Sequence, residues 1–451
     1  MGGLAFSSGP GAVATPRMKP EVYVAMRDRC MEKLRDLFEL VASPLEGPAK
    51  TTFGDVDLFV ALERKDISPP SGNDSADNAS RPLKQAISDV LGAMKWKSEH
   101  VSEMTAAVPW PEDFAFEDNA LQDRSPVNGT RPQGVQVDVH ICETVDHLQW
   151  MLFKYAHGDI WNILGSVIRP IGLTIDDMGL YIRIPEIEPF NKKQAKILLS
   201  KDPGEVLRFL DLDNTQWEVP FESQEAIFEY ATTCRFFWLS SHTPSEHFAD
   251  APTTGGTAAT GGEGEESGRK PTSHDRRRVA TRPLFRKWLE EYLPSLRAAG
   301  HFTQTPRPTR DTVRQLAFDF FPGTQKAYEE RLKLWRISRQ RDTLYRDVIK
   351  AAVPTDYDVH RRSCCAAALK KIVLHDDRSF GEKFVLPAYL KDADGLFDEN
   401  ALRLWIGSHW EAVAELAWKI NMERHAASLA RKSAAADAKI PVVATEEECG
   451  G

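Results

Sequence analysis

Two short segments of the chain alternate apolar and polar residues with the period of a β-strand. They lie at residues 53–60 and 135–141. Residues two apart in a strand point to the same face, so Asp55 and Asp57 project together while aliphatic side chains fill the opposite face. Asp138 stands in the middle of the second segment, which is equally apolar. If the two strands are neighbours, three carboxylates converge on one patch.

Other segments have apolar residues at the spacing of helices or strands. We expect further helices and strands, in chain order, at residues 19–40 (helix), 82–96 (helix), 104–110 (strand), 144–155 (helix), 159–169 (helix) and 178–184 (strand). Residues 203–241 read as helices with a break near Trp217, and the pattern from 282 to 432 is helical. The predicted fold class is therefore α+β, a small mixed β-sheet core with flanking helices followed by a mostly α-helical C-terminal domain.

Stretches without apolar periodicity separate these elements. We expect disorder at residues 1–18 and 433–451, loops at 68–81 and 111–134, and a flexible linker rich in Gly, Thr and Ala at 243–280. These boundaries predict a domain of mixed helices and strands at 19–190, a helical extension at 191–242 and a basic helical domain at 281–432.

The composition is that of an ordinary soluble protein. The chain has 451 residues, of which 42% are hydrophobic and 27% charged. No apolar run approaches the roughly 18 residues of a membrane helix, and no basic segment followed by an apolar one begins the chain, so we expect neither a membrane partner nor a secretory signal. The six cysteines include no Cys-x-x-Cys pair or zinc-type spacing. We therefore expect a reducing compartment, cytoplasmic or nuclear.

The net charge of −9 is unevenly distributed along the chain. Residues 268–432 contain about 32 Lys and Arg against about 21 Asp and Glu, whereas the front part is strongly acidic. A basic helical domain beside an acidic site suits a polyanionic substrate. Solvated helix faces explain the same charges equally well.

The three aspartates carry the most specific chemistry in the sequence. Clustered carboxylates repel one another unless cations bind them. Two divalent metals roughly 3.5–4 Å apart are the usual arrangement where phosphoryl groups are transferred. Surface carboxylates on two ordinary strands are the structural alternative.

The residues before the first strand extend this pattern into a family resemblance. Residues 41–47 read Val-Ala-Ser-Pro-Leu-Glu-Gly, and Gly54, Asp55 and Asp57 follow. The chain here resembles the DNA polymerase beta-like nucleotidyltransferase superfamily, over roughly residues 20–190. In that family an apolar residue and Gly-Ser or Gly-Gly precede an Asp-x-Asp pair, and a third Asp follows on a later strand. Ala42 stands where the family prefers Gly.

The resemblance implies metal-dependent transfer of a nucleoside monophosphate from a nucleoside triphosphate, ATP for example, to an acceptor hydroxyl. Asp55, Asp57 and Asp138 match the catalytic carboxylates that bind Mg²⁺ or Mn²⁺. Ser43, Gly47 and Gly54 match the turn that binds the nucleotide. A helix after the third Asp can line the nucleotide pocket in this family, which suggests Asn162 and Ser166, although their spacing is equally that of a packed helix.

The acceptor and the activity leave alternatives open. The basic C-terminal helices favour RNA as the acceptor, while a protein or a small metabolite is an alternative. A catalytically inactive scaffold with the nucleotidyltransferase fold, which binds a nucleotide or a partner protein, is the second hypothesis. A purely structural interaction role for the C-terminal helices is the third.

Overall fold

The computed structural model describes residues 3–64, 76–98, 100–115, 132–240 and 273–437. The chain divides into two compact units, Met1–Lys326 and Ala327–Gly451. They meet within a helix, whereas the sequence analysis expects a division in residues 243–280. Each unit is described below by itself.

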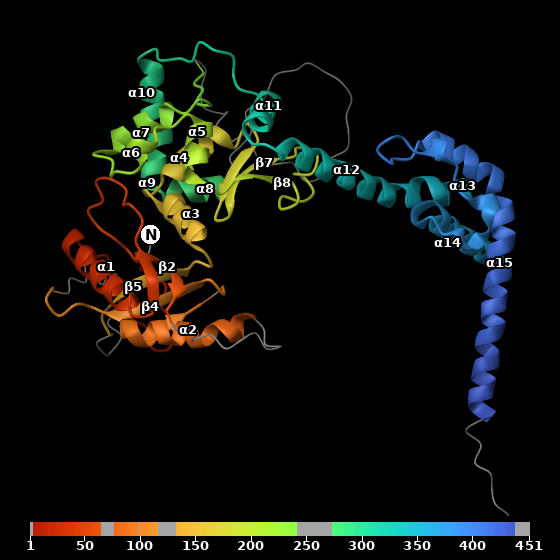
Figure 1. Cartoon of the computed structure of the whole chain (residues 1–451), viewed down its shortest axis with the longest axis horizontal. Helices are drawn as coiled ribbons and strands as arrows, with labels where there is room; N and C mark the ends of the chain where they lie inside the picture. The colour runs from red at the N-terminus through yellow and green to blue at the C-terminus, as the bar shows by residue number, and fades with distance from the viewer. Residues whose placement is uncertain (1–2, 65–75, 99, 116–131, 241–272, 438–451) are drawn as a thin grey trace, which may run out of the picture. The chain divides into compact units, whose positions relative to one another are not determined.

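A five-stranded mixed sheet forms the core of the first unit (Figure 1). Its strand order is β1-β2-β5-β4-β3, with bounds β1 Phe38–Ala42, β2 Val56–Glu63, β3 Lys95–Lys97, β4 Glu103–Pro109 and β5 Gly134–Ile141. The central strands β2 and β5 are parallel, and all other neighbours are antiparallel. The sheet and the helical C-terminal region confirm the predicted α+β class.

Two helices cover one face of this sheet, α1 (Pro20–Leu34) and α2 (Ala76–Leu91). Their buried side chains pack on the aliphatic residues that alternate along β2, β4 and β5. Val56, Leu58 and Val137 are completely buried in this core. The period of two in each strand thus places every aspartate of the sequence pattern on the opposite face.

The chain between α1 and β2 differs from its expected course. We expect one helix over residues 19–40, but α1 ends at Leu34 and β1 begins at Phe38. Apolar residues at 37 and 38 fit both the helical and the strand period. Phe38 pairs with Glu63 of β2, and this pairing places residues 38–42 in a strand. The expected loop at 68–81 is also wrong from residue 76, where α2 begins, while residues 68–75 lie outside the described chain.

Residues 3–18, which the sequence analysis expects to be disordered, are ordered in the structure. Phe6 and Val13 are each only 2% exposed and pack with Ala107. Met18 and Phe53 exchange backbone hydrogen bonds of 2.7 and 2.9 Å. The prediction of disorder was wrong for these residues because the segment is held mainly by backbone hydrogen bonds, which small residues allow. A periodic apolar face, which a sequence pattern would reveal, contributes less.

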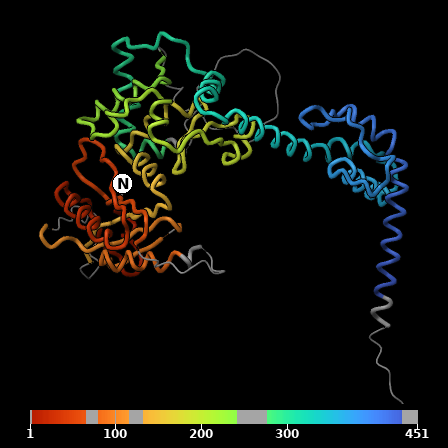
Figure 2. Tube along the Cα trace, viewed as in Figure 1, coloured from red at the N-terminus to blue at the C-terminus, as the bar shows by residue number. Residues whose placement is uncertain are grey.

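The rest of the first unit contains a second, three-stranded sheet. The trace of its residues 173–200 is drawn in yellow to yellow-green tones (Figure 2). Its antiparallel strands are β6 Leu173–Asp176, β7 Gly179–Arg183 and β8 Lys196–Ser200, so the expected helical extension at 191–242 begins with a strand. The surrounding helices are α3 Val145–Tyr155, α4 Ile160–Ile168, α5 Pro203–Leu210, α6 Asn214–Trp217, α7 Gln224–Thr232, α8 Ser273–Thr281, α9 Pro283–Lys287, α10 Leu293–Ala298 and α11 Arg310–Phe320. A π-helical turn at Trp288–Tyr292 joins α9 to α10.

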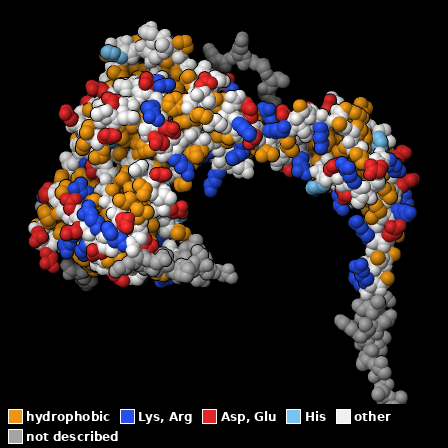
Figure 3. Space-filling view, viewed as in Figure 1, with side chains coloured by type: hydrophobic (Ala, Val, Ile, Leu, Met, Phe, Trp, Pro, Cys, Tyr) orange, Lys and Arg blue, Asp and Glu red, His pale blue; other side chains and the backbone are white. Residues whose placement is uncertain are grey.

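The second unit is helical. Its elements are α12 Thr324–Thr343, which begins in the first unit, a π-helical segment Leu344–Ile349, α13 Lys350–Ala352, α14 Val359–His375, short 3₁₀ turns at Arg378–Phe380, Glu382–Phe384 and Ala388–Leu390, and α15 Glu399–Asp437. Trp405 is buried in the core that α14 and α15 share, so this aromatic residue fills a core. Lys and Arg side chains lie on the visible surface of the unit among acidic ones (Figure 3). No helix in the described part of the chain combines the length and apolarity needed to cross a membrane.

Candidate active site

The parallel pairing of β2 and β5 brings the sequence-predicted aspartates together. Asp57 pairs directly with Asp138 in the register of the two strands. Residues opposite each other in neighbouring strands project to the same face. Asp55 lies immediately before β2, two residues before Asp57, and therefore on the same face. The two strands are neighbours, so the three carboxylates lie on one patch as predicted.

Burial, together with the neighbouring carboxylates, raises the pKa values of Asp55 and Asp138. Burial raises the pKa of Asp55 to about 6, and the charges of Asp57 and Asp138 add to the effect. Burial also raises the pKa of Asp138, with a further contribution from Asp57, although hydrogen bonds from Thr105 and Gln136 oppose it. Such perturbed carboxylates are characteristic of functional sites.

One oxygen of Asp138 has no partner. Oδ2 accepts a hydrogen bond of 3.0 Å from Nε2 of Gln136. Oδ1 is buried and accepts no hydrogen bond from any residue that the structure describes. Buried polar atoms are nearly always paired, and a buried carboxylate oxygen of this kind is suited to binding a cation.

His140 lies on the same face and completes the acidic patch. Its ring stacks on Phe59 with 4.5 Å between ring centroids, and Nε2 is 3.7 Å from Oδ1 of Asp57. Burial lowers the pKa of His140, but the carboxylates of Asp57 and Glu103 outweigh it, and the net shift is upward. The histidine therefore packs beside the carboxylates, which favour its protonated form.

Asp55 and Asp57 line a cleft of about 730 Å³. The cleft also presents five basic side chains, those of Arg17, Lys50, Lys154, Arg169 and Arg282. Tyr155, Trp161 and Ile175 add aromatic and aliphatic surface. Glu46 and Asp159 line it as well. Carboxylates and cations around one cleft suit a ligand that carries both metal-binding and anionic groups, such as a polyphosphate.

At least three of these cations form ion pairs. Lys50 pairs with Glu46, which also lines the cleft. Nη1 of Arg282 lies 2.7 Å from Oδ1 of Asp159, and thereby joins segments 123 residues apart. Nζ of Lys154 lies 3.7 Å from Oδ1 of Asp177. These pairs hold cationic groups in place without fully neutralising the cleft.

The turn between β1 and β2 is held from two sides. Oγ of Ser43 donates a hydrogen bond of 3.1 Å to the backbone carbonyl of Asp57. The backbone N–H of the buried His157 donates to the carbonyl of Leu45 at 2.7 Å, and a Cβ at Gly47 would lie only 3.3 Å from the carbonyl oxygen of His157. The ring of His157 is anchored in turn, with 2.8 Å between Nε2 and the carbonyl oxygen of Trp217.

The predicted nucleotide-binding residues divide into two groups. Gly47 and Asn162 line the cleft with Asp55 and Asp57. Ser43 and Gly54 are absent from its lining, because Ser43 is turned toward the backbone of β2 and Gly54 is buried.

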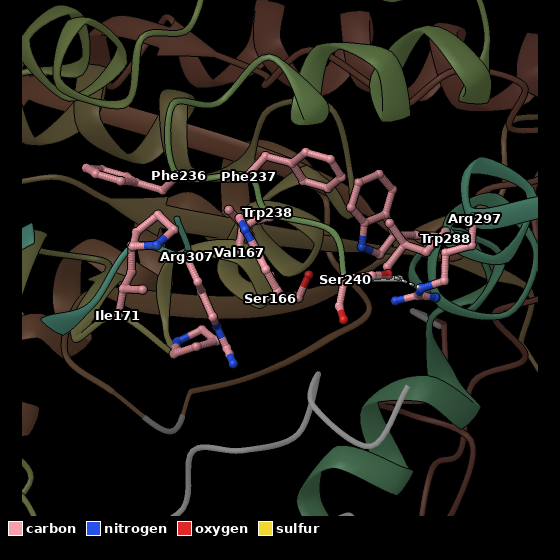
Figure 4. Close-up of a pocket in the computed structure, with 13 residues that line it drawn as sticks. Ser166, Val167, Ile171, Phe236, Phe237, Trp238, Ser240, Trp288, Arg297 and Arg307 are labelled. Carbon is pink, nitrogen blue, oxygen red and sulfur yellow. Dashed lines mark hydrogen bonds between the residues drawn. The ribbon is translucent and has the colours of Figure 1, made fainter. Parts of the chain in front are cut away.

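Ser166 lies elsewhere. It lines a separate cavity of about 50 Å³ with Trp238, Ser240 and Arg307 (Figure 4). Its Oγ donates a hydrogen bond of 2.6 Å to the backbone carbonyl of Ile163, so the side chain is bound to its own helix. The helical spacing of Asn162 and Ser166 therefore does not put them at one site.

The donor set has the chemistry of a divalent-cation site. Carboxylate oxygens are the ligands that Mg²⁺ and Mn²⁺ prefer, and the unpartnered Oδ1 of Asp138 fits such an ion. As placed, however, no group of three or more His, Cys, Asp or Glu side chains among the described residues is arranged to hold a metal. The residues nevertheless fit such an ion in chemical type.

The basic wall of the cleft is the part of the site that sequence reasoning missed. It assigned basic character to residues 268–432, whereas four of the five cations come from residues 17–169. The only available signals were Lys50 inside the turn before Asp55, and Lys154 and Arg169 near the ends of the two helices that follow Asp138.

The comparisons with known proteins give little. No protein-family model matches the chain, and none of the curated proteins matches its sequence. Among solved structures, a ternary P/T complex of Leishmania infantum polymerase beta aligns with 13% identity over 48% of this chain and 73% of its own, with a TM-score of 0.26. A ternary gap complex of the same polymerase aligns with 14% identity over 48% and 67%, with a TM-score of 0.27. Both TM-scores are low, so the proposals below rest on the geometry of the site.

Proposed function

We propose that the first unit is a metal-dependent nucleotidyltransferase, which moves a nucleoside monophosphate from a nucleoside triphosphate to an acceptor hydroxyl. One observation carries this proposal: Asp57 and Asp138 are in register on neighbouring parallel strands, with Asp55 beside them, and the Asp55–Asp57 pair lines a large cleft with basic walls. Three carboxylates on one sheet face with no basic partner at Oδ1 of Asp138 are unfavourable unless a cation joins them.

Each part of the cleft has a role in this proposal. Asp55 and Asp57 would hold Mg²⁺ or Mn²⁺, and Asp138 would hold the ion nearest the acceptor. The metals, when bound, would neutralise charge on the phosphoryl oxygens and lower the pKa of the attacking hydroxyl. Lys and Arg side chains on the walls would bind the triphosphate oxygens, and Tyr155, Trp161 and Asn162 would contact the nucleoside.

RNA is the acceptor that we propose. The charge of residues 268–432, about 32 basic against about 21 acidic, favours a polyanion over a small neutral molecule. Arg361 lies over the ring of Trp418 in the second unit, with 5.4 Å between its guanidinium carbon and the ring centroid. Such a pair is a surface on which a base can stack.

A second candidate is a catalytically inactive scaffold that keeps the fold and binds a nucleotide or a protein partner. Two observations favour it. No metal-ready group of three side chains exists among the described residues, and Ser43 is turned from the cleft toward the carbonyl of Asp57.

The deciding experiment offers α-labelled nucleoside triphosphates with Mg²⁺ or Mn²⁺ to the full chain, together with total RNA, total protein or a small-molecule extract. Asp57→Ala and Asp138→Ala should abolish labelling with folding intact. Asp36→Ala is the matched control, because Asp36 is exposed and lies outside the cleft. Label in the RNA fraction that depends on Asp57 and Asp138 would support the proposal. Equal labelling by wild type and variants would overturn the roles of Asp57 and Asp138, and no labelling despite tight Mn²⁺ binding would favour the scaffold.

A further inference from the structure

The N-terminal strap, which we define as residues 3–18, contacts both strands that carry the carboxylates. The backbone N–H of Gly134, at the start of β5, donates a hydrogen bond of 2.9 Å to the carbonyl of Ala14. Met18 pairs with Phe53, two residues before Asp55, through the two hydrogen bonds described above. The strap is thus tied to the approach of β2 and to the start of β5.

Gln136 connects the strap to Asp138. Its Oε1 accepts hydrogen bonds of 3.1 Å from the backbone N–H groups of both Gly3 and Ala5. Its Nε2 donates the 3.0 Å hydrogen bond to Oδ2 of Asp138. Gln136 is 7% exposed, so these contacts are made away from solvent.

The two strap N–H groups decide which way the amide of Gln136 points. A backbone N–H can only donate, so two of them require the oxygen of the amide, and the NH₂ group must then face Asp138. Without the strap the amide could rotate and present its oxygen to the carboxylate. In the native arrangement Gln136 occupies Oδ2 and leaves only Oδ1 without a partner.

We propose that Gln136 is a positioning residue for Asp138, and that the strap sets its orientation. The inference rests on the proposed function and adds to it a control over the third carboxylate from residues 3–5. By fixing Oδ2, the relay presents Oδ1 as the single oxygen for the metal. Partners that orient a metal ligand in this way typically change metal affinity or activity about 10–100-fold when they are removed.

The first test replaces the relay itself. Gln136→Leu keeps the volume and removes both hydrogen-bonding groups. We expect about a tenfold or greater rise in the Mn²⁺ concentration for half-maximal transfer, with the KM for the nucleoside triphosphate nearly unchanged. Mn²⁺ binding followed by electron paramagnetic resonance should weaken in parallel, which gives a readout that needs no turnover.

The second test changes the strap and leaves every site residue intact. Gly3 has φ of +90°, and a Cβ there would lie 2.9 Å from the carbonyl oxygens of Gly54 and Thr15. Gly9, in the same strap, has φ of +86° but nothing within 4 Å. Gly3→Ala should therefore shift the Mn²⁺ dependence in the same direction as Gln136→Leu. Gly9→Ala bears a similar backbone strain and should behave like the wild type.

The outcomes separate this inference from the proposed function. An active wild type in which Gln136→Leu and Gly3→Ala keep wild-type Mn²⁺ affinity and kcat would overturn the inference alone. A fall in melting temperature with unchanged Mn²⁺ dependence would assign the strap a purely structural role and overturn it equally. A wild-type chain that neither binds Mn²⁺ nor transfers nucleotide would overturn both.

Discussion

The two faces of the five-stranded sheet are built from the same strands and have opposite properties. One face of β2 and β5 is aliphatic, and α1 and α2 cover it completely. The other face carries Asp55, Asp57 and Asp138. Burial and repulsion between the carboxylates raise the pKa values of Asp55 and Asp138. The first face stabilises the fold, whereas burying carboxylates together on the second face costs stability. Such a cost is expected where a protein binds or reacts.

The strongest test of the comparison removes charge from the acidic face. Asp138→Asn, and likewise Asp57→Asn, should lower nucleotide transfer by at least about a hundredfold, because a metal ligand should matter no less than the residues that orient it. Measured in EDTA, the melting temperature should stay constant or rise, since a repulsive charge is gone. Asp36→Asn is the control. A variant that loses stability and keeps transfer would reverse the assignment of the two faces.

The next largest effect is expected on the aliphatic face. Leu58→Ala should lower the free energy of unfolding by about 2–5 kcal/mol, because Leu58 is fully buried and the change leaves a cavity. Transfer per folded molecule should be nearly unchanged. Leu62→Ala on the same strand is the control, because Leu62 is 42% exposed. Urea denaturation with parallel activity measurements checks both, and similar losses of stability at the two positions would contradict the burial argument.

A smaller effect, on the pH dependence of stability, is expected at His157, whose backbone is hydrogen-bonded to the turn between β1 and β2. Burial lowers the pKa of His157, although its hydrogen bond to the carbonyl of Trp217 opposes this. The unfolded chain therefore binds a proton at higher pH than the folded one, and this contribution to stability is lost as the pH falls below about 6.5. For one proton the slope cannot exceed about 1.4 kcal/mol per pH unit.

Comparing unfolding between pH 7.5 and 5.5 tests this. The wild type should lose more stability over that interval than His157→Gln, which keeps an amide donor and does not titrate. Parallel pH profiles for the two proteins would exclude His157 as the source.

The smallest effect is expected from a single cation at the rim. Arg282→Gln should raise the KM for the nucleoside triphosphate about two- to fivefold with kcat unchanged, as an exposed charge interaction contributes roughly 0.5–1 kcal/mol. Arg286→Gln is the matched control, because Arg286 is exposed on the same segment and does not line the cleft. Equal KM values for the two variants would place the triphosphate elsewhere.

The faces of β2 and β5 could be predicted from the sequence, because alternation in a strand is local. The convergence of Asp57 and Asp138 needed only that the two strands be neighbours. The orientation of Ser43 could not be predicted, since it depends on the carbonyl of Asp57 rather than on spacing. The separation of Ser166 from Asn162 could not be predicted either, because a helix position does not say which of two cavities the side chain faces.

The contributions of distant segments were also beyond the sequence. Arg282 reaches the cleft from far along the chain and pairs with Asp159. The strap was expected to be disordered because its residues show no apolar period, yet Gly3 and Ala5 are held by Gln136. In both cases a long-range contact determines the structure, and local sequence patterns do not reveal such contacts.

The strap also has a consequence for how the chain folds during synthesis. Its hydrogen bond from Gly3 is made to a residue 133 positions later. Because a chain is synthesised from its N-terminus onward, residues 3–5 are made before Gln136 and wait without this partner until β5 has emerged. Contacts of such sequence separation form slowly, so we expect the strap to dock after the sheet has assembled.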